Sequence, residues 1–158
     1  MCSISEIYKM LDCRSTYEEQ SQGMKLASEI GDLSLLILPF SDGESKSMWE
    51  NCARVLCEMT DDRLGPFFPQ LLEWLRDMNW PGAILILERL KQVEGHKLRN
   101  SFVETFTYAS VLNNDEGLMW LDCLSELLDN ASLKDELPKK VLEELEKHYH
   151  NWGAWSDD

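Results

Sequence analysis

The sequence predicts an all-α protein, folded as a short right-handed stack of antiparallel helix pairs. Three observations carry this prediction: apolar residues recur three and four positions apart, prolines and polar turns cut the chain into segments of helical length, and a faint repeat runs through it. A chain of 158 residues is long enough to bury one core. Residues 1–158 are therefore expected to form a single helical domain.

Periodicity and turn signals place the expected helices in order along the chain. Between the first and second of them, a short apolar piece ends at Pro39 and is followed by the loop "FSDGES". Ser47 and Glu50 have the spacing of a capping box, and Asp115 or Ser132 is expected to cap a later helix. The expected helices, of which the first is weak, cover residues 16–30, 48–59, 67–78, 81–92, 97–112, 116–129 and 133–149.

Two of these segments leave a choice between helix and strand. Residues 84–87 are apolar nearly all round, which suits either a buried strand or a central helix buried on two sides. Residues 98–112 combine helical spacing with many β-branched side chains. Pro81 and the polar finish "ERLK" favour helix for the first segment. The tail, residues 150–158, is expected to fray unless its tryptophans dock.

The repeat is visible in two nine-residue stretches. "MWENCARVL" at 48–56 and "MWLDCLSEL" at 119–127 share Met, Trp, Cys and the final Leu. Between them, "PGAILILERL" begins at Pro81. Intervals of about 35 residues are typical of helix-pair repeats, which stack so that each pair buries the apolar face of the next.

The densest group of unusual residues is "LLEWLRDMNWPGA" at 71–83. A residue before proline is pushed out of the α region, so the helix that contains Trp74 must end before Trp80. Asn79 suits a left-handed backbone, and Pro81 suits the start of the next helix. The two tryptophans are then wedges that pack across an elbow, which Asp77 braces against Arg54 or Arg89.

A functional interpretation of the same stretch uses its carboxylates. Glu73 and Asp77 are four residues apart and share a helix face, as a pair for acid–base or metal chemistry does. This alternative makes the protein a metal-dependent or carboxylate-dependent hydrolase. Arg76 between them and the absence of a neighbouring histidine favour the structural interpretation.

Other chemistry-bearing residues are scattered. His148 and His150 point to different faces of a helix, and His96 is isolated in a polar loop. The five cysteines are odd in number and form no C-x-x-C pair, so reduced cysteines are expected. No nucleophile elbow or phosphate-binding glycine loop is present. The sequence thus predicts no cofactor and no metal.

The chain is strongly acidic, with a formal net charge of −14. Residues 113–158 hold 12 of the 29 acidic side chains but 4 of the 15 basic ones. Such a surface repels phosphate backbones, so we expect no nucleic acid. The charge serves either solubility alone or the attraction of a basic protein partner. Asp122, Glu126 and Asp129 are placed along one side of their helix and form the candidate acidic face.

Localisation is predicted from two absences in the sequence. The N-terminus lacks the basic start and long apolar stretch of a secretory leader, and no apolar run approaches the roughly 20 residues that span a bilayer. A cytoplasmic protein with no membrane contact is expected. The sequence leaves the oligomeric state open.

The central block, from "WENCA" through "LLEWLRDMNWPGA", resembles an uncharacterised family of small bacterial proteins, a domain of unknown function. The resemblance covers about residues 33–95 and is most specific at 77–81. It implies a HEAT-like or armadillo-like helical fold and no reaction. Some such proteins lie among toxin–immunity genes, which suits an immunity or antitoxin-like inhibitor of a basic effector. The candidate motif comprises Glu73, Trp74, Asp77, Asn79, Trp80 and Pro81.

Overall fold

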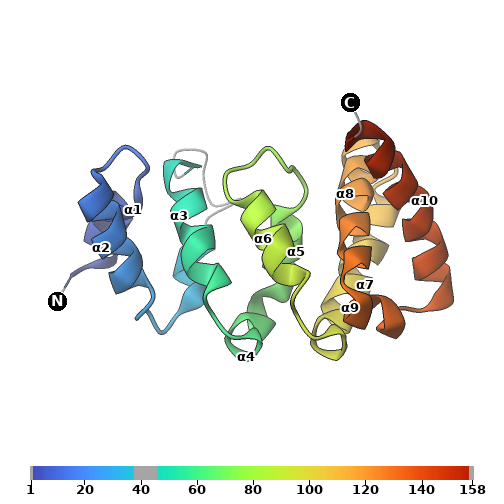
Figure 1. Cartoon of the computed structure of the whole chain (residues 1–158), viewed down its shortest axis with the longest axis horizontal. Coiled ribbons are helices and arrows are strands. Elements are labelled where there is room, and N and C mark those ends of the chain that lie inside the picture. Colours follow the sequence, from blue (N-terminus) through green and yellow to red (C-terminus); the bar gives the residue numbers. More distant parts are fainter. Residues whose placement is uncertain (1, 38–45, 157–158) are drawn as a thin grey trace.

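The structure, a computed structural model, describes residues 2–37 and 46–156, with side chains up to residue 148. Every regular element in this part of the chain is helical, so the predicted all-α fold is confirmed. Figure 1 shows the helices standing side by side in a row that follows the chain, with the two termini at opposite ends.

The row is built from α-helices with short 3₁₀ segments between some of them. The elements are α1 (Ile4–Leu11), α2 (Tyr17–Ala27), η1 (Leu33–Leu36), α3 (Lys46–Cys57), α4 (Asp61–Leu64), η2 (Gly65–Phe67), α5 (Phe68–Trp74), α6 (Ala83–Leu90), α7 (Gly95–Val111), α8 (Asp115–Ser125), η3 (Glu126–Asp129), α9 (Ala131–Glu136) and α10 (Lys139–Ser156). Helix α1 packs on α2, and both contact α3, which in turn packs on α6. Helix α5 packs on α7, α7 on α8 and α9, and α8 on α10.

The last predicted helix, residues 133–149, is wrong as a single element. Pro138 divides it into α9 (Ala131–Glu136) and α10 (Lys139–Ser156). Leu137, the residue before this proline, has the extended backbone that proline imposes on its predecessor. Helix α10 continues to Ser156, while the side chains of the predicted frayed tail lie outside the described part.

The predicted helix caps are also corrected. Ser47 lies inside α3 rather than before it, and its hydroxyl donates to Asp12 Oδ2 at 3.0 Å. A capping box forms instead at Ser3, whose side chain accepts from the Glu6 amide. Asn114 and Asn130 cap α8 and α9, in place of the expected Asp115 and Ser132.

Both ambiguous segments are helices, α6 and α7. Helix α6 is not buried on two sides, however, because the side chain of Ile84 is 62% exposed while Ile86, Leu87 and Leu90 are buried. The apolar run in this helix thus combines one core face with one apolar residue that contacts solvent.

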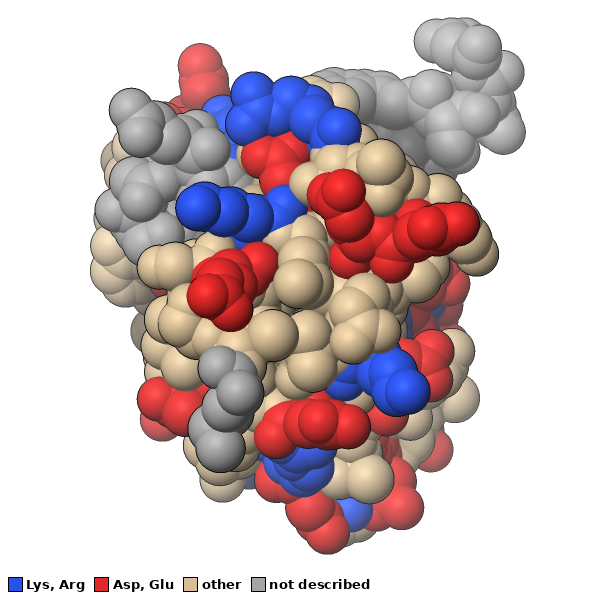
Figure 2. All heavy atoms as spheres, turned by 90° about the vertical axis from the view of Figure 1, so that its left-hand side faces the viewer, with Lys and Arg blue, Asp and Glu red and all other residues tan. Residues whose placement is uncertain are grey.

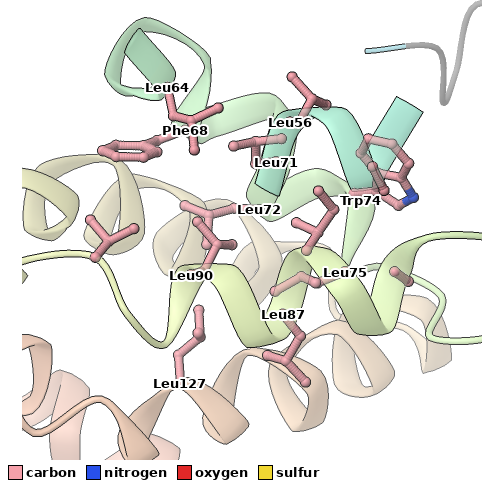
Figure 3. Packing of buried hydrophobic residues seen from close by; sticks show 14 of the residues in the cluster. Leu56, Leu64, Phe68, Leu71, Leu72, Trp74, Leu75, Leu87, Leu90 and Leu127 are labelled. Carbon is pink, nitrogen blue, oxygen red and sulfur yellow. The ribbon is translucent and has the colours of Figure 1, made fainter. Parts of the chain in front are cut away.

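The core runs through the row from α1 to α10 as one cluster of buried side chains. Figure 3 shows part of it, with α5 contributing Phe68, Leu71, Leu72 and Trp74 between residues of α3 and α6. Phe68 and Trp74 are among the largest side chains that are almost fully buried. Because α5 lies at this centre, the turn that follows it is held on a rigid base.

The first half of the sequence repeat lies in α3, and the second half lies in α8 and the first residues of η3. Their tryptophans, cysteines and leucines are all buried, in the pairs Trp49 and Trp120, Cys52 and Cys123, and Leu56 and Leu127. The repeated residues therefore face the core in both helices. The two methionines differ, because Met119 is 49% exposed.

The N-terminal end of the row carries charges of both signs. Figure 2 shows acidic and basic side chains interspersed over this end, with an uncharged area between them. The excess of negative charge is not gathered into one block on this face of the molecule.

Candidate functional site

The elbow between α5 and α6 is closed by hydrogen bonds from the motif itself. The buried Trp74 indole donates from Nε1 to the Pro81 carbonyl oxygen at 3.0 Å. The backbone N–H of Asn79 donates to Asp77 Oδ1 at 2.8 Å. Asp77 therefore braces the turn through the backbone and not against Arg54 or Arg89, which pair with Glu50 and Asp61.

The left-handed residue of the elbow is Gly82, with φ of 86°, and not Asn79 as predicted. An added Cβ at Gly82 would lie 2.7 Å from Ala53 Cβ and 3.1 Å from the Trp49 carbonyl oxygen. The glycine thus meets two requirements, a positive φ and a close approach to α3. Pro81 precedes the helix by two positions and does not open it.

Three tryptophans lock the elbow to α3. The Trp49 ring meets Trp74 and Trp80 edge to face, with centroids 6.4 and 5.9 Å apart. Trp74 is fully buried, as expected, whereas Trp80 is half-buried. The exposed part of Trp80 borders surface hollows on both of its sides.

One of these hollows, of about 390 Å³, lies between the elbow and α8. Its lining residues are Arg76, Asp77, Trp80, Glu116 and Met119. The Arg76 guanidinium lies 3.4 Å from Glu116 Oε2, which lines the same hollow, and 3.6 Å from Glu73 Oε1, which does not.

A neighbouring hollow, of about 260 Å³, lies between α5, α7 and α8. It is lined by Pro69, Glu73, Glu104, Thr105, Tyr108 and Trp120. The Tyr108 and Trp120 rings are nearly perpendicular, with centroids 5.9 Å apart. The Trp120 indole donates to the Leu72 carbonyl oxygen at 3.1 Å, which fixes this ring to α5.

Arg76 joins the two hollows into one surface. Its guanidinium carbon lies 5.1 Å from the centroid of the Trp120 ring, and its partners Glu73 and Glu116 line different hollows. We call this surface the α5–α8 groove, defined by Pro69, Glu73, Arg76, Asp77, Trp80, Glu104, Thr105, Tyr108, Glu116, Met119 and Trp120. It carries four carboxylates and one cation.

The three carboxylates of the predicted acidic face all have partners within the fold. Asp122 contacts His148 on α10, with 2.6 Å between Oδ1 and Nδ1. Lys91 lies 3.7 Å from Glu126 and 3.2 Å from Asp129. Burial raises the pKa of Glu126 above its usual value, although the nearby ammonium of Lys91 opposes this effect. Asp122 and Glu126 are moreover only partly exposed, at 16% and 14% of their side chains.

The residues of the hydrolase alternative have separate partners. Glu73 pairs with Arg76, and Asp77 accepts from the Asn79 amide. In the described part of the chain, no three His, Cys, Asp or Glu side chains are grouped to hold a metal. His96 is exposed near Glu94, and the His150 side chain lies outside the described part.

Free cysteines are found at all five positions. Burial raises the pKa of Cys52 and of Cys123 to about 12, and that of Cys57 to about 11. Since the thiolate is the nucleophilic form, these three thiols are inert at neutral pH. They serve as small core residues.

Sequence reasoning found α5 and the elbow but not the groove's other wall. Glu104, Tyr108, Met119 and Trp120 come from α7 and α8, some 40 positions along the chain from α5. The available signal was the repeat, which marks Trp120 as the counterpart of the core residue Trp49. The exposure of Met119 has no such signal, because its counterpart Met48 is partly buried. None of the helices described here has the length and apolar character needed to cross a membrane.

Comparison with known proteins identifies the family alone. No curated protein and no solved structure matches the chain. One family model matches residues 48–152, from α3 into α10. The match includes the acidic C-terminal third, which the expected range of 33–95 left out. The chain belongs to the family described as a domain of unknown function (DUF5071).

Proposed function

We propose that this protein is a protein-binding module whose α5–α8 groove takes a basic, partly apolar segment of a partner. The observation that carries the proposal is the coincidence of exposed apolar side chains with an acidic rim. Exposed large apolar residues are few in the described chain, and two of them, Tyr108 on α7 and Met119 on α8, line the groove.

The composition of the groove supports a protein partner. Aromatic side chains and methionine are enriched where proteins bind one another, and Trp80, Tyr108 and Met119 supply them here. Tyr108 and Met119 are each about half exposed, at 54% and 49%, so their apolar area is accessible to a ligand. Contact with a partner would remove this area from water.

The charge of the groove supports a basic partner. Glu73, Asp77, Glu104 and Glu116 face the single cation Arg76, and the chain as a whole has a net charge of −14. Complementary charge accelerates association and selects among partners. Neutralisation of a basic effector in the bacterial cytoplasm, as an immunity protein or antitoxin performs it, is the role that fits this chemistry.

Selection from a displayed random-peptide library tests the proposal. Wild type should enrich peptides that combine arginine or lysine with apolar residues, and Glu104→Lys/Glu116→Lys should not. The matched control is Glu29→Lys/Glu58→Lys, which makes the same charge change at exposed sites on the N-terminal half. Equal enrichment by the groove variant, or enrichment of neutral or acidic peptides by wild type, would refute the proposal.

A further inference from the structure

The smaller hollow of the groove combines two features of a site for an organic cation. Two aromatic rings, Tyr108 and Trp120, meet nearly at right angles at its wall, and carboxylates from two helices, Glu73 on α5 and Glu104 on α7, stand beside them. Aromatic faces attract cations through the ring quadrupole, and carboxylates add charge-assisted hydrogen bonds. We infer that this hollow is an anchor pocket for one arginine side chain of the partner.

The fold already places a guanidinium on one of these rings. Arg76 lies over Trp120 at 5.1 Å from the ring centroid. Trp120 is fixed by its hydrogen bond to Leu72 and is only 3% exposed, so Arg76 is the cation that this ring accepts. The ring accessible to an incoming guanidinium is Tyr108, which is 54% exposed. Guanidinium is planar and weakly hydrated, so it suits a site with aromatic walls better than an ammonium does.

The carboxylates retain capacity for a ligand. Glu104 is exposed and forms no ion pair within the described chain. Glu73 lies 3.6 Å from Arg76, longer than the roughly 2.8 Å of a charge-assisted hydrogen bond. An incoming guanidinium would therefore find one carboxylate without a cation and a second that is only loosely paired.

The size of the pocket points to a side chain of a larger partner. Its volume of about 260 Å³ is below the roughly 300–1,000 Å³ of typical small-molecule sites. The cation is organic rather than metallic, because the described chain assembles no group of three metal-binding side chains. The inference rests on the proposed function and names the chemistry of its anchor.

Two matched small probes test the anchor by NMR of the ¹⁵N-labelled protein. Nα-acetyl-arginine methylamide should shift the Trp120 indole signal and the amides of Glu104 and Tyr108. The citrulline counterpart, which has the same shape without the charge, should bind about tenfold more weakly. Equal binding of the two probes, or shifts confined to other parts of the protein, would overturn the inference.

Variants separate the anchor from the groove as a whole. Glu104→Gln should weaken binding of the arginine probe several-fold, whereas Glu58→Gln, at a distant exposed site, should bind the probe like wild type. If Glu104→Gln binds the arginine probe as tightly as wild type does, the inferred anchor pocket is contradicted. If the library peptides still bind the groove in that case, the proposed function stands and the anchor alone fails; if no basic peptide binds, both fail.

Discussion

The indole nitrogen of Trp74 donates a hydrogen bond to the carbonyl oxygen of Pro81, 3.0 Å away across the turn between α5 and α6. The fully buried Trp74 ring at the end of α5 thus fixes the backbone just before α6 begins. Since Asp77 and Trp80 project from this turn into the α5–α8 groove, the geometry of the groove depends on the same bond.

Substitutions at the two tryptophans of the motif should have unequal effects. Trp74→Ala should lower the free energy of unfolding by roughly 3–5 kcal/mol, and Trp80→Ala by less, because only the first ring is completely buried. Trp74→Phe keeps most of the volume but leaves the Pro81 carbonyl without its donor, at a cost of about 1–3 kcal/mol. Urea unfolding measures all three. Equal losses for the two alanine variants would contradict the assigned burial.

Gly82 should resist substitution. Gly82→Ala forces a positive φ on alanine and brings its Cβ against Ala53, so a loss of more than about 1 kcal/mol is expected. Gly31→Ala is the control, because nothing lies within 4 Å of the added Cβ there. Thermal unfolding should show a lower melting temperature for Gly82→Ala than for Gly31→Ala. Similar melting temperatures would mean that the close approach of the elbow to α3 does not matter.

Two asparagines provide a contrast between core and motif. Asn130 donates to the carbonyl oxygens of Leu90 and Val93 and accepts from the Leu133 amide, all in the interior. Asn130→Ala should cost roughly 2–4 kcal/mol, since it removes a helix cap and leaves two buried acceptors without their donor. Asn79→Ala should cost under about 0.5 kcal/mol, because that side chain is exposed. Denaturant titration measures the free energy of unfolding of both variants. A larger loss for Asn79→Ala than for Asn130→Ala would contradict the assigned roles of the two side chains.

The pair of Asp61 and Arg89 should make stability depend on acid pH. Burial alone would raise the pKa of Asp61, but hydrogen bonds from Arg89 and from the Glu94 amide outweigh it and lower the pKa below its usual value. A carboxyl whose pKa is lowered by folding stabilises the protein above its unfolded pKa of about 3.9. That contribution is lost as the pH falls through the folded value.

Asp61→Asn isolates this effect. The free energy of unfolding should fall less steeply between about pH 5 and pH 2 in the variant than in wild type, because the substituted amide does not titrate. Glu29→Gln, at an exposed site, should leave the slope unchanged. Parallel curves for Asp61→Asn and wild type would show that the pair does not contribute.

Most of the helices were predictable because their signals are local, although α1 was not among those expected. Apolar spacing placed α3, α5, α6, α7 and α8 within a few residues, and the residue before a proline marked the elbow. The same rule applied to Pro138 would have divided α9 from α10. Ser47 was misassigned because its hydroxyl bonds Asp12, 35 positions earlier, and a local pattern contains no such partner.

The site was predictable only in part, since its second wall is made by tertiary packing. Arg76 meets Glu116 across 40 positions of sequence, and Lys91, directly after α6, contacts both Glu126 and Asp129. Charge counted along one helix cannot identify such partners. The acidic face therefore remains a prediction. Its three carboxylates already contact Lys91 or His148, whereas the four carboxylates of the groove lie beside accessible apolar area.

The most direct test of a basic partner in the groove is an NMR titration of the ¹⁵N-labelled protein with a synthetic peptide of the sequence enriched from the library. We expect perturbations at the indole signals of Trp80 and Trp120 and at the amides of Tyr108, Glu116 and Met119, weakening as salt is added because exposed charges are screened. Perturbations confined to Asp122, Glu126 and Asp129, or to α1 and α2, would contradict the account.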